Sequence, residues 1–367
     1  SNVSQALQGR LPGVSVTAQD GRPGAEVSIR VRGGGSITQS NDPLFIVDGF
    51  PVGSISDIPS DQIESIDVFK DASSTAIYGA RGANGVVLIT TKGGSEGRGK
   101  INYNTYFGVK NITKTLDVLS PYEYVYWQYE LQGTGSNNDR YFGDFQDYKL
   151  YKQMEGTNWQ EEVFGRTGTT MYHNLAASGG SKIFKYNASL TYNDEEEIMI
   201  GSGYTRTNLN VKTFSKVNDW ISVDLSARLS DTQLKGAGTS SNSQLVNALQ
   251  YRPVNGLMEF IDYTLTDDDY DTSNAYILNP VEHTNDDYRR AHNLIFNFNG
   301  AATIKILKNL DYRLEYGSQY GETNNRRFYG IHTYNVQIYG EQPMANIGNI
   351  KSFNSRLANV LTYSKRD

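Results

Sequence analysis

From Ile101 onward the sequence repeats one pattern, in which apolar and polar side chains alternate over segments of about ten residues. Such a period of two predicts β-strands with one apolar and one polar face. The length of each segment suits a tilted strand that crosses a lipid bilayer. We predict eight antiparallel strands, at or near residues 101–109, 169–178, 184–192, 204–214, 221–229, 293–303, 310–320 and 352–364.

The connections between these segments alternate in length. Long connections are expected at 111–168, 232–290 and 322–351, with an intermediate one at 194–203 and short ones at 179–181, 216–219 and 308–309. Short turns at one end and long loops at the other are typical of outer-membrane barrels, whereas a soluble β-protein needs no such segregation. Transporter barrels that enclose a further domain need about 22 strands. Either the eight strands belong to a longer chain or the barrel interpretation fails, and we favour the longer chain, of whose barrel these are the first strands.

The composition favours a membrane barrel and disfavours other classes. Tyrosine occurs 26 times, and its amphipathic ring suits the headgroup boundary of a membrane. No uninterrupted run of eighteen apolar residues is present, so the sequence predicts no transmembrane helix. The net charge of −6 disfavours nucleic acid as a partner, because binding phosphates needs a basic footprint.

Residues 1–97 differ from the rest of the chain. They combine short helical signals, glycine-rich turns and short apolar strands such as 44–47 and 85–89. We predict an α+β domain at 1–97, followed by antiparallel transmembrane β-barrel strands at 98–367. The glycine-rich stretch 93–99 is predicted to be a flexible boundary.

The first part of the chain resembles the plug domain of TonB-dependent receptors. The resemblance lies in Val3–Val14, Ile29–Gly33, Asn41–Pro51 and Ile63–Lys92, which occur in the family's order. Lys70-Asp71-Ala72 resembles the SusC/RagA branch, because other TonB-dependent receptors tend to have Gly-Pro in place of Asp71-Ala72. The matching signature positions are Asp48, Gly49, Lys70, Asp71, Tyr78, Gly79, Arg81, Asn84 and Gly85.

This resemblance implies a plugged β-barrel in the outer membrane of a Gram-negative bacterium, in contact with outer-membrane lipid. It implies import of oligosaccharides driven by TonB, together with a SusD-like surface lipoprotein. No cofactor and no catalysis are expected. The signal peptide and the segment that TonB grips are expected before Ser1. Alternatives are peptide import by a RagA-like transporter, a metal-chelate or cobalamin receptor, which Lys70-Asp71-Ala72 disfavours, and a surface adhesin or passive porin, the latter needing no plug.

Two sets of residues are candidates for contacts within the protein. The resemblance implies that arginines of the Arg-Gly strand, here Arg30 and Arg32, pair with glutamates of the barrel wall; the alternative is that they are solvated strand residues. Asp48-Gly49 is predicted to form a turn, because both residue types tolerate the conformation that a turn requires. A substrate contact is the alternative role of this pair.

Two further features could bind a ligand. Ser120-Pro121-Tyr122-Glu123 predicts the start of a helix, and the aromatic side chains of Tyr124, Tyr126 and Trp127 could stack on sugars or contact a lipoprotein; packing of a long loop is the simpler interpretation. Asp267, Asp269 and Asp271 have the spacing of the first ligands of a calcium loop. Thr272 replaces the required glycine and Leu278 the final glutamate, so a solvated acidic loop is favoured and no metal is predicted.

Overall fold

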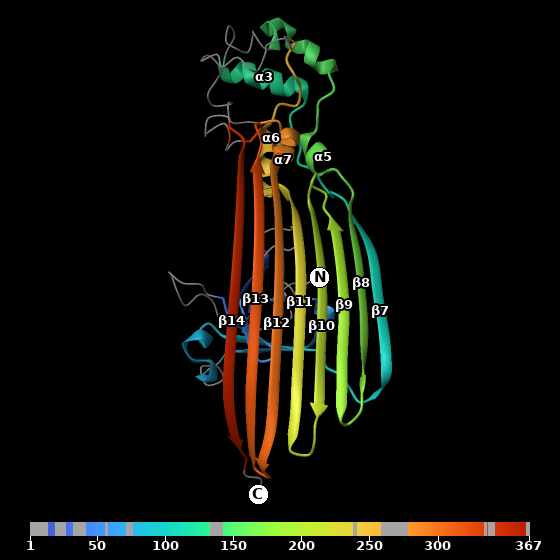
Figure 1. Cartoon of the computed structure of the whole chain (residues 1–367). Helices are drawn as coiled ribbons and strands as arrows, with labels where there is room; N and C mark the ends of the chain where they lie inside the picture. Colours follow the sequence, from blue (N-terminus) through green and yellow to red (C-terminus); the bar gives the residue numbers. More distant parts are fainter. Residues whose placement is uncertain are drawn as a thin grey trace.

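The fold consists of a tall, curved wall of eight antiparallel strands with two small sheets against one of its faces (Figure 1). The computed structural model describes residues 14–18, 27–31, 42–55, 58–70, 76–132, 142–237, 241–257, 278–333, 336 and 342–364. We call β7–β14 the wall, and the sheets within residues 14–91 the N-terminal sheets. The inner face of the wall is the one toward the N-terminal sheets.

Each strand of the wall pairs only with its neighbours in the sequence, in the order β7 to β14. The predicted eight antiparallel strands are therefore confirmed. Short turns join them at the lower end of Figure 1, and the long connections lie at the upper end. The strands are β7 (Gly97–Lys110), β8 (Gly168–Gly180), β9 (Phe184–Glu196), β10 (Gly203–Lys216), β11 (Ile221–Ala237), β12 (Asp287–Leu307), β13 (Leu310–Tyr329) and β14 (Met344–Tyr363).

The strands are longer than the sequence predicted, and two expected loops are correspondingly shorter. The prediction of connections at 232–290 and 322–351 was wrong at their ends, because β11 continues to Ala237 and β12 begins at Asp287, while β13 continues to Tyr329 and β14 begins at Met344. The backbone N–H and C=O groups remain paired there. The apolar alternation fades before the hydrogen-bonded ladder ends, since pairing satisfies the backbone whether or not the side chains are apolar.

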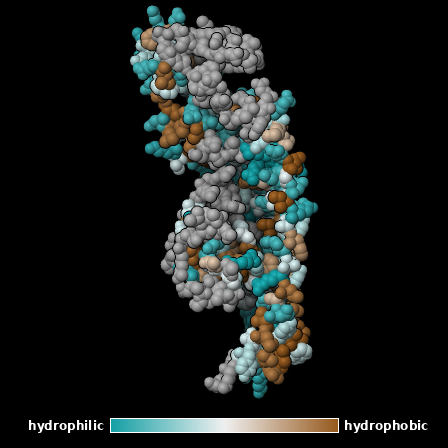
Figure 2. All heavy atoms as spheres, turned by 90° about the vertical axis from the view of Figure 1, so that its left-hand side faces the viewer, coloured by the Kyte–Doolittle hydropathy of each residue, from teal (hydrophilic) through white to brown (hydrophobic). Residues whose placement is uncertain are grey.

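The wall buries polar side chains on its inner face and exposes apolar side chains on its outer face, which is the reverse of a soluble protein. On the inner face the buried side chains are largely polar, and Thr191 and Asn208 are fully buried. The neighbouring residues in each strand point outward, and among them Leu190, Leu209 and Phe296 are exposed. Figure 2 shows hydrophobic side chains gathered at the lower end of the wall. An outward apolar band with a polar interior is the arrangement of a transmembrane barrel.

The N-terminal sheets have a hydrophobic core of their own. A two-stranded sheet pairs β1 (Val14–Ala18) with β2 (Val27–Val31), and a four-stranded sheet has the order β4-β3-β6-β5. Its strands are β3 (Leu44–Val47), β4 (Phe50–Val52), β5 (Ile63–Phe69) and β6 (Val86–Thr91). Only β3 and β6 run parallel. Two 3₁₀ helices, η1 (Ser60–Gln62) and η2 (Ala76–Gly82), flank β5. The core side chains include Ile29, Val31, Phe45, Val47, Ile58, Val87 and Ile89.

Short helices lie in the long connections at the upper end. They are α3 (Pro121–Gln132), η3 (Phe145–Gln153), α5 (Trp159–Phe164), α6 (Ser241–Gln250) and α7 (Pro280–Asp286). The predicted helix start at Ser120 is confirmed: Glu123 N donates to Ser120 Oγ over 3.3 Å, and Ser120 N donates to Glu123 Oε2 over 2.9 Å. Within the described ranges, no helix has both the length and the apolar character needed to cross a membrane.

Candidate functional site

The hairpin between β3 and β4 is closed by the two residues Asp48 and Gly49. Both have positive φ, 48° and 86° respectively, and Val47 pairs directly with Phe50. This is the two-residue turn for which Asp-Gly is favoured, because its twist matches that of the flanking strands. The predicted turn is therefore confirmed, and it holds the Asp48 carboxylate at the tip of the hairpin.

The Asp48 carboxylate links the N-terminal sheets to the wall. Its Oδ1 accepts from Lys212 Nζ of β10 over 2.8 Å and from Thr91 N over 3.1 Å, while its Oδ2 accepts from Thr91 Oγ1 over 2.6 Å. Lys212 Nζ also donates to Thr91 O over 2.9 Å. The side chains of Asp48 and Lys212 are 8% and 26% exposed. Removal of either charge therefore leaves a largely buried partner, which makes this ion pair a lock between the two parts of the fold.

The same hairpin tip reaches two further strands of the wall. A Cβ atom at Gly317 of β13 would lie 2.2 Å from Phe50 Cδ2, so only glycine lets the ring approach the backbone this closely. Arg356 Nη1 of β14 donates to Gly49 O over 3.2 Å. Asp48, Gly49 and Phe50 thus each contact the wall, and we call the three residues the docking tip.

A second contact joins η1 to β8 and β9. Tyr172 OH donates to Asp61 Oδ2 over 2.5 Å, and Gln62 Nε2 donates to Thr191 Oγ1 over 3.2 Å. Asn174 Nδ2 donates to the same Thr191 hydroxyl over 2.8 Å. Among the described residues, the docking tip and this η1 contact thus join the N-terminal sheets to the wall at two places.

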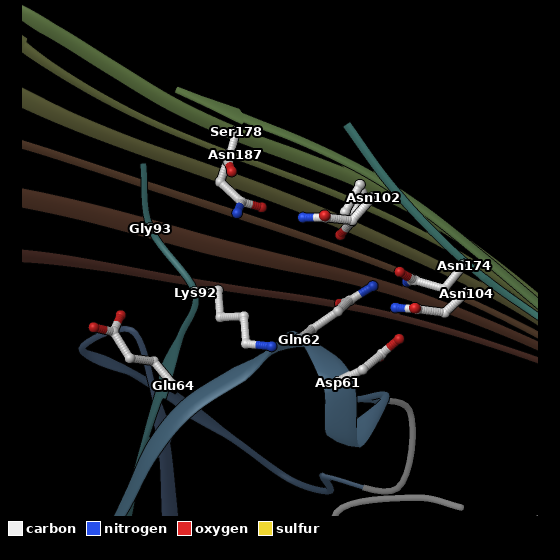
Figure 3. A pocket seen from close by; sticks show the side chains of 12 residues that line it. Asp61, Gln62, Glu64, Lys92, Gly93, Asn102, Asn104, Asn174, Ser178 and Asn187 are labelled. Atoms are coloured by element: carbon white, nitrogen blue, oxygen red, sulfur yellow. The ribbon is translucent and has the colours of Figure 1, made fainter. Parts of the chain in front are cut away.

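Two cavities flank these contacts. One, of about 500 Å³, lies between η1 and strands β7–β9. Figure 3 shows Gln62 and Lys92 on the side of the N-terminal sheets, with Asn102, Asn174 and Asn187 facing them from the wall. The other, of about 400 Å³, adjoins the docking tip and is lined by more strongly charged side chains, including Asp224, Arg313, Glu315 and Arg356.

The connection between the N-terminal sheets and the wall requires one of its glycines for space. A Cβ atom at Gly94 would lie 2.3 Å from the backbone N of Tyr186, whereas one at Gly93 would meet nothing within 4 Å. Glu96 further along pairs with Lys185 over 3.1 Å. Gly94 therefore allows close packing against β9. The flexibility predicted for residues 93–99 stays a prediction.

We expect Gly94→Ala to destabilise the seating of the N-terminal sheets by about 2 kcal/mol, because the added methyl group must displace a strand backbone. Gly93→Ala is the matched control and should leave stability unchanged. Limited proteolysis of residues 14–91 in the intact protein measures the difference. Equal protection of the two variants would contradict the packing role of Gly94.

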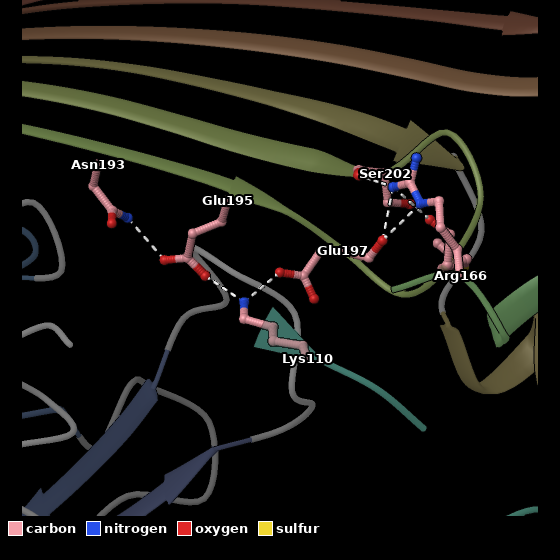
Figure 4. A network of polar contacts seen from close by, with 7 residues as sticks. Lys110, Arg166, Asn193, Glu195, Glu197 and Ser202 are labelled. Carbon is pink, nitrogen blue, oxygen red and sulfur yellow. Dashed lines mark hydrogen bonds and ion pairs between the residues drawn. The ribbon is translucent and has the colours of Figure 1, made fainter. Parts of the chain in front are cut away.

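A network of charged side chains joins the upper ends of the first wall strands (Figure 4). Lys110 Nζ, at the end of β7, pairs with Glu195 over 2.6 Å and with Glu197 over 2.7 Å. Arg166 Nη2 donates to the carbonyl oxygens of Glu197 and Ser202 over 2.7 and 3.0 Å. Both cations thus fix the turn between β9 and β10, which stiffens the mouth of the wall.

The predicted aromatic residues lie together at the upper end, above the wall. Tyr124 is half-buried and packs edge-on against Phe142, with ring centroids 6.3 Å apart. Tyr126 and Trp127 are exposed on α3, and Tyr126 lies 5.7 Å from the ring of Tyr148 in η3. Tyr124 therefore packs within the loop, whereas Tyr126 and Trp127 are available to a ligand or partner.

His283 in α7 makes the loop helices sensitive to acid. It is buried, with Nδ1 lying 3.1 Å from Gln244 Oε1 of α6. Burial lowers the pKa of His283 below its ordinary value of 6.5, against the opposing effect of Asp287 and Asp286. The unfolded chain then takes up the proton first, so the stability that this residue contributes is present above pH 6.5 and is lost as the pH falls below it.

We therefore expect amide exchange in α6 and α7 to accelerate between pH 7.5 and pH 5, after correction for the intrinsic rate. His283→Asn should weaken this pH dependence. Exchange protection that is independent of pH in the unsubstituted protein would refute the assignment.

The other predicted site residues are distributed as follows. Arg30 is exposed on β2, and within the described residues no ion pair joins it to the wall; Arg32 lies outside those residues. Gly79 and Gly85 have φ of 61° and 92°, and Gly85 packs on Val31 in the core of the N-terminal sheets. Lys70, Tyr78 and Asn84 are half-buried and Arg81 is exposed, whereas Asp71, Asp267, Asp269 and Asp271 lie outside the described residues.

Sequence reasoning missed Lys212 as the wall partner of the docking tip. The only signal was its place in β10, where Asn208, Asn210 and Lys212 occupy alternate positions of the inner face. A cation that continues a row of inward polar residues indicates an anionic partner inside. The family resemblance implied that Arg30 and Arg32 of the N-terminal sheets pair with glutamates of the wall, whereas in the pair of Asp48 with Lys212 the acid is on the N-terminal sheets.

Comparisons with known proteins agree with this geometry. The family TonB-dependent Receptor Plug Domain matches residues 1–86. TonB-dependent receptor P3 of Formosa agariphila is 31% identical over 338 residues, which cover 89% of this chain and 31% of that protein. TonB-dependent receptor SusC of Bacteroides thetaiotaomicron is 33% identical over 252 residues, which cover 66% of this chain and 24% of that protein. This chain thus spans about a third or less of both relatives.

The wall and the N-terminal sheets together match a solved structure. The RagAB peptide importer in its closed-closed state superposes with a TM-score of 0.77 at 22% identity, over all of this chain and 44% of the importer chain. The fold is thus that of a plug beside part of a β-barrel wall. We conclude that the chain belongs to the SusC/RagA-type TonB-dependent receptors, the plugged β-barrel proteins of the outer membrane.

Proposed function

We propose that this protein imports oligosaccharides across the outer membrane, driven by TonB and assisted by a SusD-like surface lipoprotein. The observation that carries the proposal is the chemistry of the inner face. Most of its buried polar side chains are neutral amides and hydroxyls, and two buried arginines, Arg206 and Arg228, add positive charge. Asparagine both donates and accepts hydrogen bonds, as a sugar hydroxyl does, so the inner face offers a neutral oligosaccharide many weak partners without binding it irreversibly.

Import requires the plug to leave its seat, and the contacts of the plug with the wall suit such a step. The docking tip and the η1 contact depend on single hydrogen bonds, one ion pair and one ring packed on glycine. Of these residues, only Phe50 also belongs to the hydrophobic core of the N-terminal sheets, whose other members contact one another. A pull on the chain therefore meets contacts that can separate one after another, while the strand pairs of the wall stay intact.

A peptide is the second candidate cargo. The cavity beside the docking tip favours it, because Asp224, Arg313 and Glu315 offer both signs of charge. Arg313 Nη1 lies 3.2 Å from Asp224 Oδ2, and its Nε lies 2.8 Å from Glu315 Oε1. Such a group could exchange partners with the charged ends of a peptide. The RagAB structure is described as a peptide importer, which adds to this alternative.

Growth of a strain that lacks the gene distinguishes the two cargoes. For oligosaccharide import, we expect growth on one polysaccharide to be lost, while growth on its free monosaccharide is unchanged. Loss of growth on peptides as the carbon source, with polysaccharide growth intact, would establish the alternative. Unchanged growth on every polymer tested would refute the import proposal.

A further inference from the structure

Three cations form one row across the outer face of the wall. Lys235 of β11 is directly opposite Arg290 of β12, and Arg290 is directly opposite Arg326 of β13. All three side chains are exposed. Each is an even number of residues from an exposed apolar residue of its own strand, such as Leu225 or Phe328, so the row faces away from the plug.

Such a row is unfavourable without an anion. Like charges directly opposite each other on neighbouring strands repel. Arg290 lies over the ring of Tyr288, 5.0 Å from its centroid, and donates to the Tyr288 hydroxyl; Arg326 Nε donates to Asn324 Oδ1 over 3.1 Å. In the described part of the chain, no carboxylate forms an ion pair with any of the three. Most of their N–H donors therefore face solvent or membrane.

The nearby acidic side chains either contact another basic side chain or are separated from the row by a further strand. Asp231 Oδ2 lies 2.7 Å from His292 Nε2, and Glu322 Oε1 lies 3.4 Å from Lys351 Nζ. Glu196 belongs to the same row but is separated from Lys235 by Gly203 on the strand between them. The row thus keeps its positive charge.

The level of the row indicates which anion it meets. On β12 the exposed apolar residues end at Phe296, and Arg290 lies roughly 20 Å further along that strand, toward the long loops. On β13 and β14 the exposed apolar residues Phe328 and Ile347 border the row. With the tilt of a barrel strand, this places the row beside the headgroups of the outer leaflet, above the acyl chains. The side chains point sideways from the wall and not toward its mouth, which favours a lipid over a capping protein.

We propose that Lys235, Arg290 and Arg326 bind the phosphate groups of an outer-leaflet lipid headgroup. The planar guanidinium fork matches phosphate oxygens in a bidentate manner, and neighbouring strands about 5 Å apart bring the three charges within reach of one diphosphorylated headgroup. The bound lipid relieves the repulsion within the row, and its acyl chains lie along the apolar band below. The intact receptor would then carry an annular lipid at a defined place on β11–β13.

Native mass spectrometry of the intact, detergent-solubilised receptor with added lipid A tests the site. The variant Arg290→Gln/Arg326→Gln should bind lipid A about 30-fold more weakly, since each cation near an anionic surface contributes a factor of about five. The matched control is Lys182→Gln/Lys308→Gln, which removes two exposed cations from the short turns at the opposite end and should bind as the unsubstituted receptor does. Dephosphorylated lipid A should bind all three forms equally weakly.

Two outcomes would overturn the proposal. One is equal binding of lipid A by the variant and the control. The other is competition by millimolar inorganic phosphate that displaces lipid A fully, which would show a free-anion site in place of a lipid site. Should the double variant fail to reach its folded, heat-modifiable form, Lys235→Gln replaces it, with an expected loss of about fivefold.

Discussion

Import is expected to stop when the docking tip is covalently joined to the wall through residues 50 and 317. Phe50 Cδ2 lies 2.2 Å from the position of a Cβ atom on Gly317. The Cβ positions of the two residues are therefore within reach of a disulfide, whose Cβ atoms are separated by about 3.5–4.5 Å. The chain contains no cysteine, so Phe50→Cys/Gly317→Cys introduces the only thiols of this segment.

Uptake of the cargo by oxidised cells should fall to the level of the deletion strain and recover on addition of a membrane-permeant reductant. The single variants Phe50→Cys and Gly317→Cys separate the effect of the disulfide from that of lost packing, because Phe50 belongs to the core of the N-terminal sheets. Full import by the oxidised double variant would show that the docking tip keeps its place on β13 while cargo passes.

Loss of the Lys212 charge is expected to loosen the resting plug. Lys212→Met leaves the Asp48 carboxylate with its Thr91 contacts but without its cation, which destabilises the seated plug by about 2 kcal/mol. The unseated population then rises about thirtyfold. Cells should become sensitive to a large antibiotic that the intact outer membrane excludes, measured as a fall in the inhibitory concentration.

Lys216→Met is the matched control for this prediction. Lys216 belongs to the same strand and pairs with Asp219 over 2.6 Å, but Asp219 is 97% exposed, so the loss of that pair has little effect. A double-mutant cycle with Asp48→Asn isolates the interaction, since asparagine also tolerates the positive φ of the turn. Additive effects of Asp48→Asn and Lys212→Met would show that the ion pair does not hold the plug.

The strands and turns of this protein were predictable because their signals are local. Alternation along Ile101–Val109 specifies a strand by itself, and Asp48-Gly49 specifies its turn by the backbone conformation that the two residues tolerate. The upper ends of β11–β14 were not predictable in the same way. Polar residues such as Arg289 and Arg327 continue the ladder there, and hydropathy cannot distinguish a polar strand from a polar loop.

The identity of the residues that join the plug to the wall could not be derived from the sequence. Lys212 lies 164 residues from Asp48, and Arg356 lies 307 residues from Gly49. Only the folded register decides which inward residue of β10 stands at the level of the hairpin tip. Resemblance to a family predicted a plug and a wall, whereas the sign of the charges at this contact required the structure.

The height of β12 has a consequence for the shape of the cargo. Ile295 is at the level of Thr191, where η1 meets the wall, and from there the strand rises roughly 25 Å to Asp287. Over this length the inner-facing residues of β12 and β13 include Asn293, Arg289, Asn325 and Arg327, so amide and guanidinium groups follow one another above the plug. Under the proposed function, a linear chain of several units that lay along these strands would meet many of these groups. A short molecule would meet only a few, which predicts that uptake favours the longer cargo.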